Sequence, residues 1–134
     1  MNVYSPKKML TASKAVKTKT FAFIDDIKAG GGTNIYDALL TAFDFGGKGG
    51  SDRKKLLSKS VDTVFFLSDG VPTAGKLVNT DQILRDIALR NKTRNIIIHA
   101  VGLTTETDKE EEKSKLADFV KKLAEENGGN YAQK

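Results

Sequence analysis

The sequence predicts an α/β fold: a three-layer, Rossmann-like arrangement in which helices flank a parallel sheet. Two near-continuous apolar and β-branched runs, 61–67 and 95–101, are typical of parallel strands covered on both faces. Segments with helical apolar spacing follow each run, which gives the strand–helix order of a parallel sheet. With 134 residues, 39% of them hydrophobic and 29% charged, the chain is expected to form a single domain over residues 1–134.

Two helices are expected before the first strand. From Thr11 to Lys28 apolar residues recur at helical spacing, and the pattern stops at residues 30–32, which are all glycine. A second helix follows, with Asn34 and Asp37 spaced like a capping pair at its start. Residues 46–60 mix glycine, serine and lysine without a sustained period, so a mobile connection is expected there.

Strand and helix alternate in the second half of the chain. After the run 61–67, Thr80-Asp81 is expected to cap a helix, and the strand 95–101 ends at Gly102. A last helix is expected to begin at residues 110–112, which are all glutamate and suit the positive end of a helix. Residues 130–132 are predicted as a short third strand.

The position of the strand 61–67 within the sheet is the difficult point. A run this apolar is expected at the centre of a sheet, yet the chain offers it one obvious neighbour. If residues 61–67 form an edge instead, we expect self-association through that strand or completion by a partner segment, because an unpaired edge is a template for strand pairing. Alternatively, residues 1–10 add a short strand.

Composition excludes several classes of site. The chain has no cysteine, so disulfides and thiolate chemistry are excluded. The net charge is +5, but the one dense basic cluster, residues 53–55 with Lys59 nearby, has no interleaved aromatic residues and is interpreted as a solvated loop, with no nucleic-acid partner. No segment has the length of apolar sequence that a membrane span or a signal peptide needs. The compartment is not indicated.

Asp69 and Thr33 are the candidate site residues. Asp69 follows the most apolar strand, at the carboxyl end where open α/β sheets bind ligands. Thr33 follows three glycines and opens a helix, so a pliable backbone can bring it to the same end. A hydroxyl and a carboxylate are ligands that Mg²⁺ or Mn²⁺ prefers. The alternatives are that the Asp69 carboxylate only caps the loop 70–75, and that Thr33 or Asn34 only caps the second helix.

Two stretches, GGGTNIYDAL and FFLSDGVPTAG, resemble the von Willebrand factor type A family, in particular its bacterial members. The resemblance covers roughly residues 20–134. It implies a doubly wound domain with a metal ion-dependent adhesion site, where a protein partner's carboxylate completes the octahedron around a divalent cation. Thr33 matches the family's loop threonine, and Asp69 matches its loop aspartate.

The sequence departs from the family in one respect. The family's Asp-x-Ser-x-Ser motif occurs nowhere in these 134 residues. The chain is therefore expected to be the C-terminal portion of such a domain, with the N-terminal strands upstream of Met1. We expect the incomplete site to hold Mg²⁺ weakly, since that ion gives up its water reluctantly.

An enzymatic function is the alternative hypothesis. The lone histidine, His99, lies inside an apolar strand and is expected to be a core or sheet-face residue, and Ser68 lacks a GxSxG context. Asp69 could instead serve a metal-assisted phosphoryl-transfer or hydrolytic enzyme, because phospho-accepting aspartates also end parallel strands.

Overall fold

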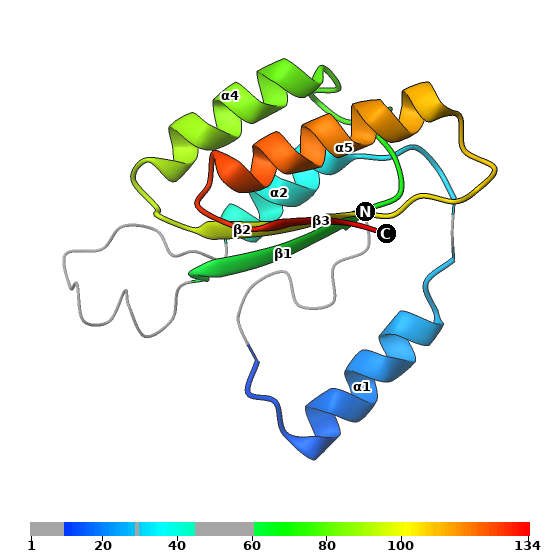
Figure 1. The fold of residues 1–134 in the computed structure, drawn as a ribbon. Coiled ribbons are helices and arrows are strands. Elements are labelled where there is room, and N and C mark those ends of the chain that lie inside the picture. Colours follow the sequence, from blue (N-terminus) through cyan, green and yellow to red (C-terminus); the bar gives the residue numbers. More distant parts are fainter. Residues whose placement is uncertain (1–9, 29, 45–60) are drawn as a thin grey trace.

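A computed structural model describes residues 10–28, 30–44 and 61–134 of the chain. Helices and strands alternate in the second half, and β1, β2 and β3 form a parallel sheet in that order (Figure 1). The predicted α/β, Rossmann-like fold is confirmed. The elements are α1 (Lys14–Asp25), α2 (Ile35–Asp44), β1 (Thr63–Ser68), α4 (Thr80–Asn91), β2 (Ile97–Gly102), α5 (Glu110–Glu125) and β3 (Tyr131–Gln133).

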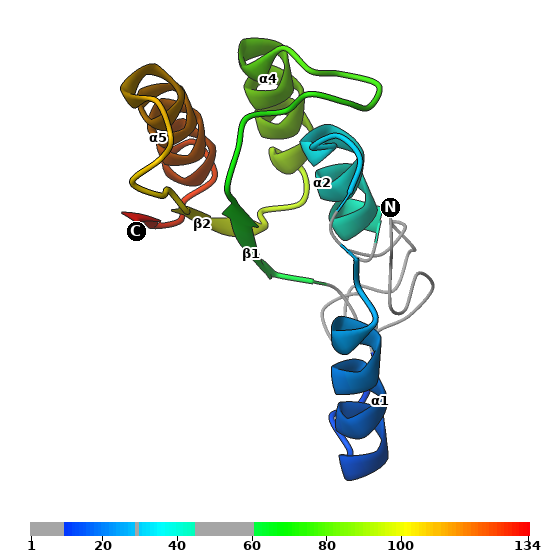
Figure 2. The ribbon, with the colours of Figure 1, turned by 90° about the vertical axis from the view of Figure 1, so that its right-hand side faces the viewer.

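Three helices cover one face of this sheet. Helices α2, α4 and α5 all lie on the same side of the strands, whereas α1 lies on the opposite side (Figure 2). The core fills the layer between the three helices and the sheet, and includes Leu39 of α2, Ile87 of α4, Val120 of α5 and Ile98 of β2. The core side chains follow the period of about 3.6 in the helices and of 2 in the strands, as amphipathic elements require.

The other face of the sheet differs from the expectation. Residues 61–67 were expected to be covered on both faces, but Phe65 is 73% exposed and Leu67 is 60% exposed. Alternate residues of the same strand, Val64 and Phe66, pack against the core. The strand is also at the edge of the described sheet. It pairs with β2 alone, and Phe65 lies opposite His99. The prediction of a strand buried on both faces is therefore wrong for the described part of the chain.

The helix starts were predicted in part. Asn34 caps α2, since its side-chain oxygen accepts a hydrogen bond from the Asp37 amide at 3.2 Å. The cap of α4 was misplaced: Asn79, one residue before Thr80, accepts the Gln82 amide at 3.0 Å. Asparagine is as good a cap as serine or aspartate, so the Asn-Thr-Asp sequence left the choice open.

Some expectations fall outside the described residues. The strand expected as an alternative at residues 1–10 lies almost wholly in a segment that the structure does not describe. The connection at 46–60 lies wholly in another such segment. None of the helices in the described ranges combines the length and the apolar character needed to cross a membrane.

Candidate functional site

Thr33 and Asp69 lie at the same hollow beyond the carboxyl ends of the strands. The hollow has a volume of about 260 Å³ and is lined by the loops that follow β1 and β2 and by the start of α5. The structure therefore brings together the two residues that the sequence singled out. The polar or charged side chains at its wall include Thr33, Asp69, Thr104, Asp108, Glu112 and Lys113.

Backbone hydrogen bonds hold Thr33 against the loop that follows β1. The Thr33 amide donates to the Thr73 hydroxyl at 2.8 Å, and the Thr33 carbonyl accepts from the Thr73 amide at 2.9 Å. The hydroxyl of Thr33 lies close to Gly70, the residue after Asp69: a Cβ atom added at Gly70 would be 3.9 Å from the hydroxyl oxygen. The segment after the glycines is thus fixed beside the loop that carries Asp69.

The Thr33 hydroxyl is not needed as a helix cap. Asn34 fills that role, and its amide nitrogen also donates to the Asp37 carboxylate at 2.8 Å. Asp37 in turn accepts the Lys76 amide at 3.3 Å, which ties the start of α2 to the same loop. Among the described residues nothing forms a hydrogen bond with the Thr33 hydroxyl. The sequence left open whether Thr33 or Asn34 caps the second helix, and the structure shows that Asn34 does.

Asp69 does not cap its own loop. Its side chain is exposed, and in the described ranges it has no hydrogen bond or ion pair. Ser68 organises the turn instead: its buried hydroxyl donates to the Gly70 carbonyl at 2.7 Å. Serine hydroxyls commonly close such turns, so the Ser-Asp-Gly sequence held a signal for this role that our sequence analysis did not use. The Asp69 carboxylate is left available to a ligand.

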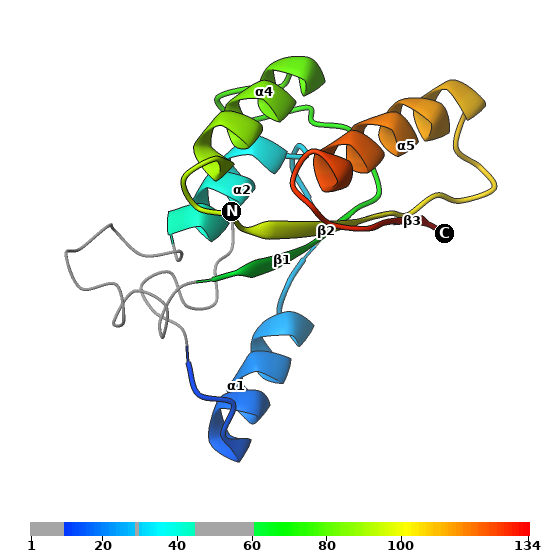
Figure 3. The same cartoon turned by 60° about the vertical axis from the view of Figure 1, so that its left-hand side comes forward.

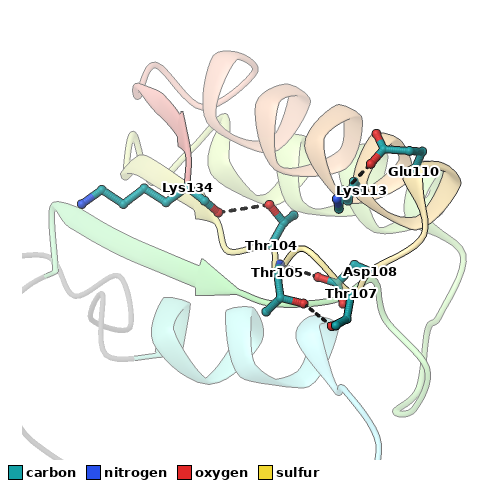
Figure 4. A network of polar contacts seen from close by, with 7 residues as sticks. All are labelled: Thr104, Thr105, Thr107, Asp108, Glu110, Lys113 and Lys134. Carbon is teal, nitrogen blue, oxygen red and sulfur yellow. Dashed lines mark hydrogen bonds and ion pairs between the residues drawn. The ribbon is translucent and has the colours of Figure 1, made fainter.

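A polar loop after β2 forms the facing wall. The Asp108 carboxylate accepts the Thr105 amide at 2.6 Å, and Thr105 and Thr107 share a hydroxyl contact of 2.9 Å (Figure 4). The Thr105 amide, and to a lesser degree the nearby Lys113, hold the pKa of Asp108 below its usual value, so this carboxylate is charged at neutral pH. Sequence analysis missed Asp108, although it follows β2 at the carboxyl edge where ligands bind.

The donor set suits a hard cation but is small. A hydroxyl and a carboxylate are the oxygen donors that Mg²⁺ or Mn²⁺ prefers, and those of Thr33 and Asp69 have no partner among the described residues. Within residues 10–28, 30–44 and 61–134, however, no three His, Asp or Glu side chains converge so as to hold a metal ion. Thr33 and Asp69 would therefore need water or a partner's oxygens to complete a coordination sphere.

His99 has a structural role. Its ring stacks on Phe65 with the centroids 5.1 Å apart, and its Nδ1 atom accepts the Asn130 amide at 3.0 Å. This arrangement places it on the exposed face of the sheet, as a sheet-face residue. It does not line the hollow that contains Asp69.

The class that fold and site define is an α/β domain with a polar hollow at the carboxyl edge of a parallel sheet. No protein-family model matches the chain, and no solved structure matches it. Over 90% of its length the chain is similar to inter-alpha-trypsin inhibitor heavy chain H2: 32% identical to the protein of Mesocricetus auratus, and 31% to those of Homo sapiens and Mus musculus. The chain spans 12% of the length of these relatives.

Proposed function

We propose that this chain is a von Willebrand factor A-like module that binds a protein partner through a divalent cation, held in part by Thr33 and Asp69. The observation that carries the proposal is the shared hollow, in which a hydroxyl and a carboxylate without described partners lie on adjoining loops. The similarity to heavy chains of inter-alpha-trypsin inhibitor, which by name are parts of a larger protein, supports an interaction role. We also propose that the chain groups with the bacterial members of this family.

The chemistry of this site is coordination. A bound Mg²⁺ or Mn²⁺ would supply positive charge and open positions for the carboxylate of a protein ligand. Thr33 and Asp69 would contribute one oxygen each, on loops that the Thr33–Thr73 hydrogen bonds keep together. With so few protein oxygens, a dissociation constant on the order of 1 mM is expected in the absence of the partner.

Isothermal titration with Mg²⁺ and Mn²⁺ tests this proposal. Asp69→Asn and Thr33→Val are expected to abolish measurable binding, while Thr33→Ser retains it because the hydroxyl is kept. Asp62→Asn is the matched control, since Asp62 is an exposed acid at the opposite end of the same strand region. Equal metal affinity in Asp69→Asn and Asp62→Asn would contradict the role of Asp69.

The enzymatic alternative has its own readout. The exposed Asp69 carboxylate at the end of a parallel strand is also where a phospho-acceptor would be placed. Incubation with a small phosphodonor and Mg²⁺, followed by mass spectrometry, separates the two functions. Stable or turned-over phosphorylation at Asp69 would replace the adhesion proposal with a phosphoryl-transfer one.

A further inference from the structure

The hollow that contains Thr33 and Asp69 has a second charged wall, at the start of α5. Asp108 lies in the loop after β2, and Glu112 and Lys113 lie at the beginning of the helix. Among the described residues that line the hollow, Lys113 is the one with a positive charge. An anion that enters the hollow therefore meets a single basic side chain on the described wall.

This wall lies over the central strand of the described sheet. Strand β2 lies between β1 and β3, and α5 packs on its last residue: a Cβ atom added at Gly102 would be 3.7 Å from the Leu116 Cγ atom. Figure 3 shows the loop 103–109 leaving the end of β2 and turning back into α5. Because β2 already pairs on both sides, a strand added to the sheet beyond β1 leaves this wall in place.

Lys113 is held by an ion pair that an anion can replace. Its ammonium group donates to the Glu110 carboxylate at 2.9 Å (Figure 4). An ammonium group has three donor hydrogens, and this bond uses one of them. The Lys113 side chain is 21% exposed, whereas that of Glu110 is 90% exposed. An ion pair with so exposed a partner contributes little to stability, so the ammonium can turn to a ligand at small cost.

The charges around the hollow favour an order of binding. Asp69, Asp108 and Glu112 each carry a negative charge at neutral pH. Lys113 offsets one of these three charges, which leaves the described lining with a net charge of −2. This lining repels a carboxylate ligand, whereas a bound divalent cation brings the sum to zero. The acidic ligand is therefore expected to bind after the cation.

We propose that Lys113 is the second anchor of the acidic ligand, whose carboxylate lies between the cation at Thr33 and Asp69 and the Lys113 ammonium group. The role of Lys113 rests on the function proposed for the site, because the cation is the first anchor. A carboxylate has two oxygens, so one can face the cation while the other accepts a hydrogen bond from the lysine. Hydrogen bonds between charged groups are among the strongest that side chains form.

The size of the hollow indicates the class of ligand. Its volume of about 260 Å³ is below the range of roughly 300–1,000 Å³ that is typical of sites for small organic ligands. An acidic side chain that projects from a protein surface needs less space. The ligand that fits is thus an aspartate or glutamate side chain of a protein partner.

A peptide titration tests the role of Lys113. The probe is acetyl-Gly-Glu-Gly-amide, added to the 134-residue chain in excess Mg²⁺ and followed by nuclear magnetic resonance, with the glutamine peptide as the control ligand. Lys113→Met is expected to weaken binding of the glutamate peptide by about 10-fold, the effect of losing one hydrogen bond between charged groups. Lys113→Arg is expected to retain most of the affinity, because the positive charge and the donors are kept.

Lys115→Met is the matched control for Lys113→Met. Lys115 is on the same helix and pairs with Glu111 at 2.6 Å, but its side chain is 63% exposed and it does not line the hollow. We expect this variant to bind the glutamate peptide as the unchanged chain does. Circular dichroism verifies that each variant is folded.

Metal affinity separates the role of Lys113 from the function proposed for the site. Lys113→Met removes a positive charge beside the cation, so isothermal titration at low salt is expected to show Mg²⁺ binding about 3-fold tighter while the peptide binds more weakly. An unchanged chain that binds no Mg²⁺ would overturn the proposed function and the role of Lys113 with it.

Three other results would overturn the role of Lys113 alone, while Mg²⁺ binding to the unchanged chain supports the proposed function. One is equal peptide affinity in Lys113→Met and Lys115→Met. Another is equal affinity of the unchanged chain for the glutamate and glutamine peptides. The third is no binding of the glutamate peptide by the unchanged chain in excess Mg²⁺.

Discussion

At the scale of single residues, Gly129 is, among the described glycines, the one that another backbone segment approaches most closely. A Cβ atom there would overlap the carbonyl of Ile98 in β2. We expect Gly129→Ala to destabilise the protein by about 2–3 kcal/mol, because overpacking forces the backbone of one segment to move. Gly30→Ala is the control: Gly30 has nothing within 4 Å of its added Cβ, and a change below about 0.5 kcal/mol is expected. Urea unfolding measures both, and equal stability of the two variants would contradict the close packing at Gly129.

The residues of the hollow show which roles a sequence reveals. Thr33 and Asp69 could be predicted because position alone, after a glycine run and after a strand, places them at one edge of the sheet. Ser68 and Asp108 could not be assigned so directly. Their roles depend on which nearby donor or acceptor each side chain selects, and several polar neighbours compete for that choice.

At the scale of elements, a charged network joins α2 to α4. The Tyr36 hydroxyl of α2 donates to the Asp86 carboxylate of α4 at 2.8 Å, and Arg90 donates to the same carboxylate oxygen. The hydrogen bond from Arg90, and then that from Tyr36, lower the pKa of Asp86 below its ordinary value of 3.8. A carboxylate with a depressed pKa stabilises the folded state above its unfolded pKa and loses that contribution as pH falls through the folded pKa.

The variant Asp86→Asn tests this linkage. At pH 7 we expect it to lower the free energy of unfolding by about 1 kcal/mol, a modest value because the Asp86 side chain is 31% exposed. The difference from the unchanged protein should shrink as the pH is lowered below about 4, where the unfolded Asp86 is already protonated. Urea unfolding at pH 7, 4 and 3 measures it. Asp118→Asn, at an exposed site on α5, is the control, and a gap that is constant across these pH values would argue against the role of Asp86.

Element boundaries were predictable where the signal was local. The glutamates at 110–112 begin α5 as expected, and Asn34 and Asp37 begin α2. The buried pair Asn91 and Asn127 was not predictable, although its 2.7 Å hydrogen bond joins the ends of α4 and α5 beside β2. These residues are far apart in the sequence, and no local pattern marks two asparagines as partners.

At the scale of the whole molecule, the fold class could be predicted because the apolar periods of strands and helices are properties of short segments. The place of β1 in the sheet could not. Strand order depends on contacts between distant segments. An apolar run of six or seven residues has the same sequence pattern whether the strand lies at the centre or at the edge of the sheet. Among the described strands β2 is the central one, with Ile98 0% and Ala100 1% exposed, and β1 takes the edge.

This arrangement predicts a pattern of amide hydrogen exchange. Strand β2 pairs on both sides and packs against α5, so its amides are expected to exchange slowest, through global unfolding. Helix α1 buries none of its residues and is expected to exchange fastest among the described helices when the chain is dilute. Hydrogen exchange followed by nuclear magnetic resonance measures this order. Exchange in α4, which buries Ile83, Leu84 and Ile87, is expected to lie between these two rates. Exchange in α1 as slow as in β2 would contradict this order, because it would mean that the helix is packed against the rest of the chain.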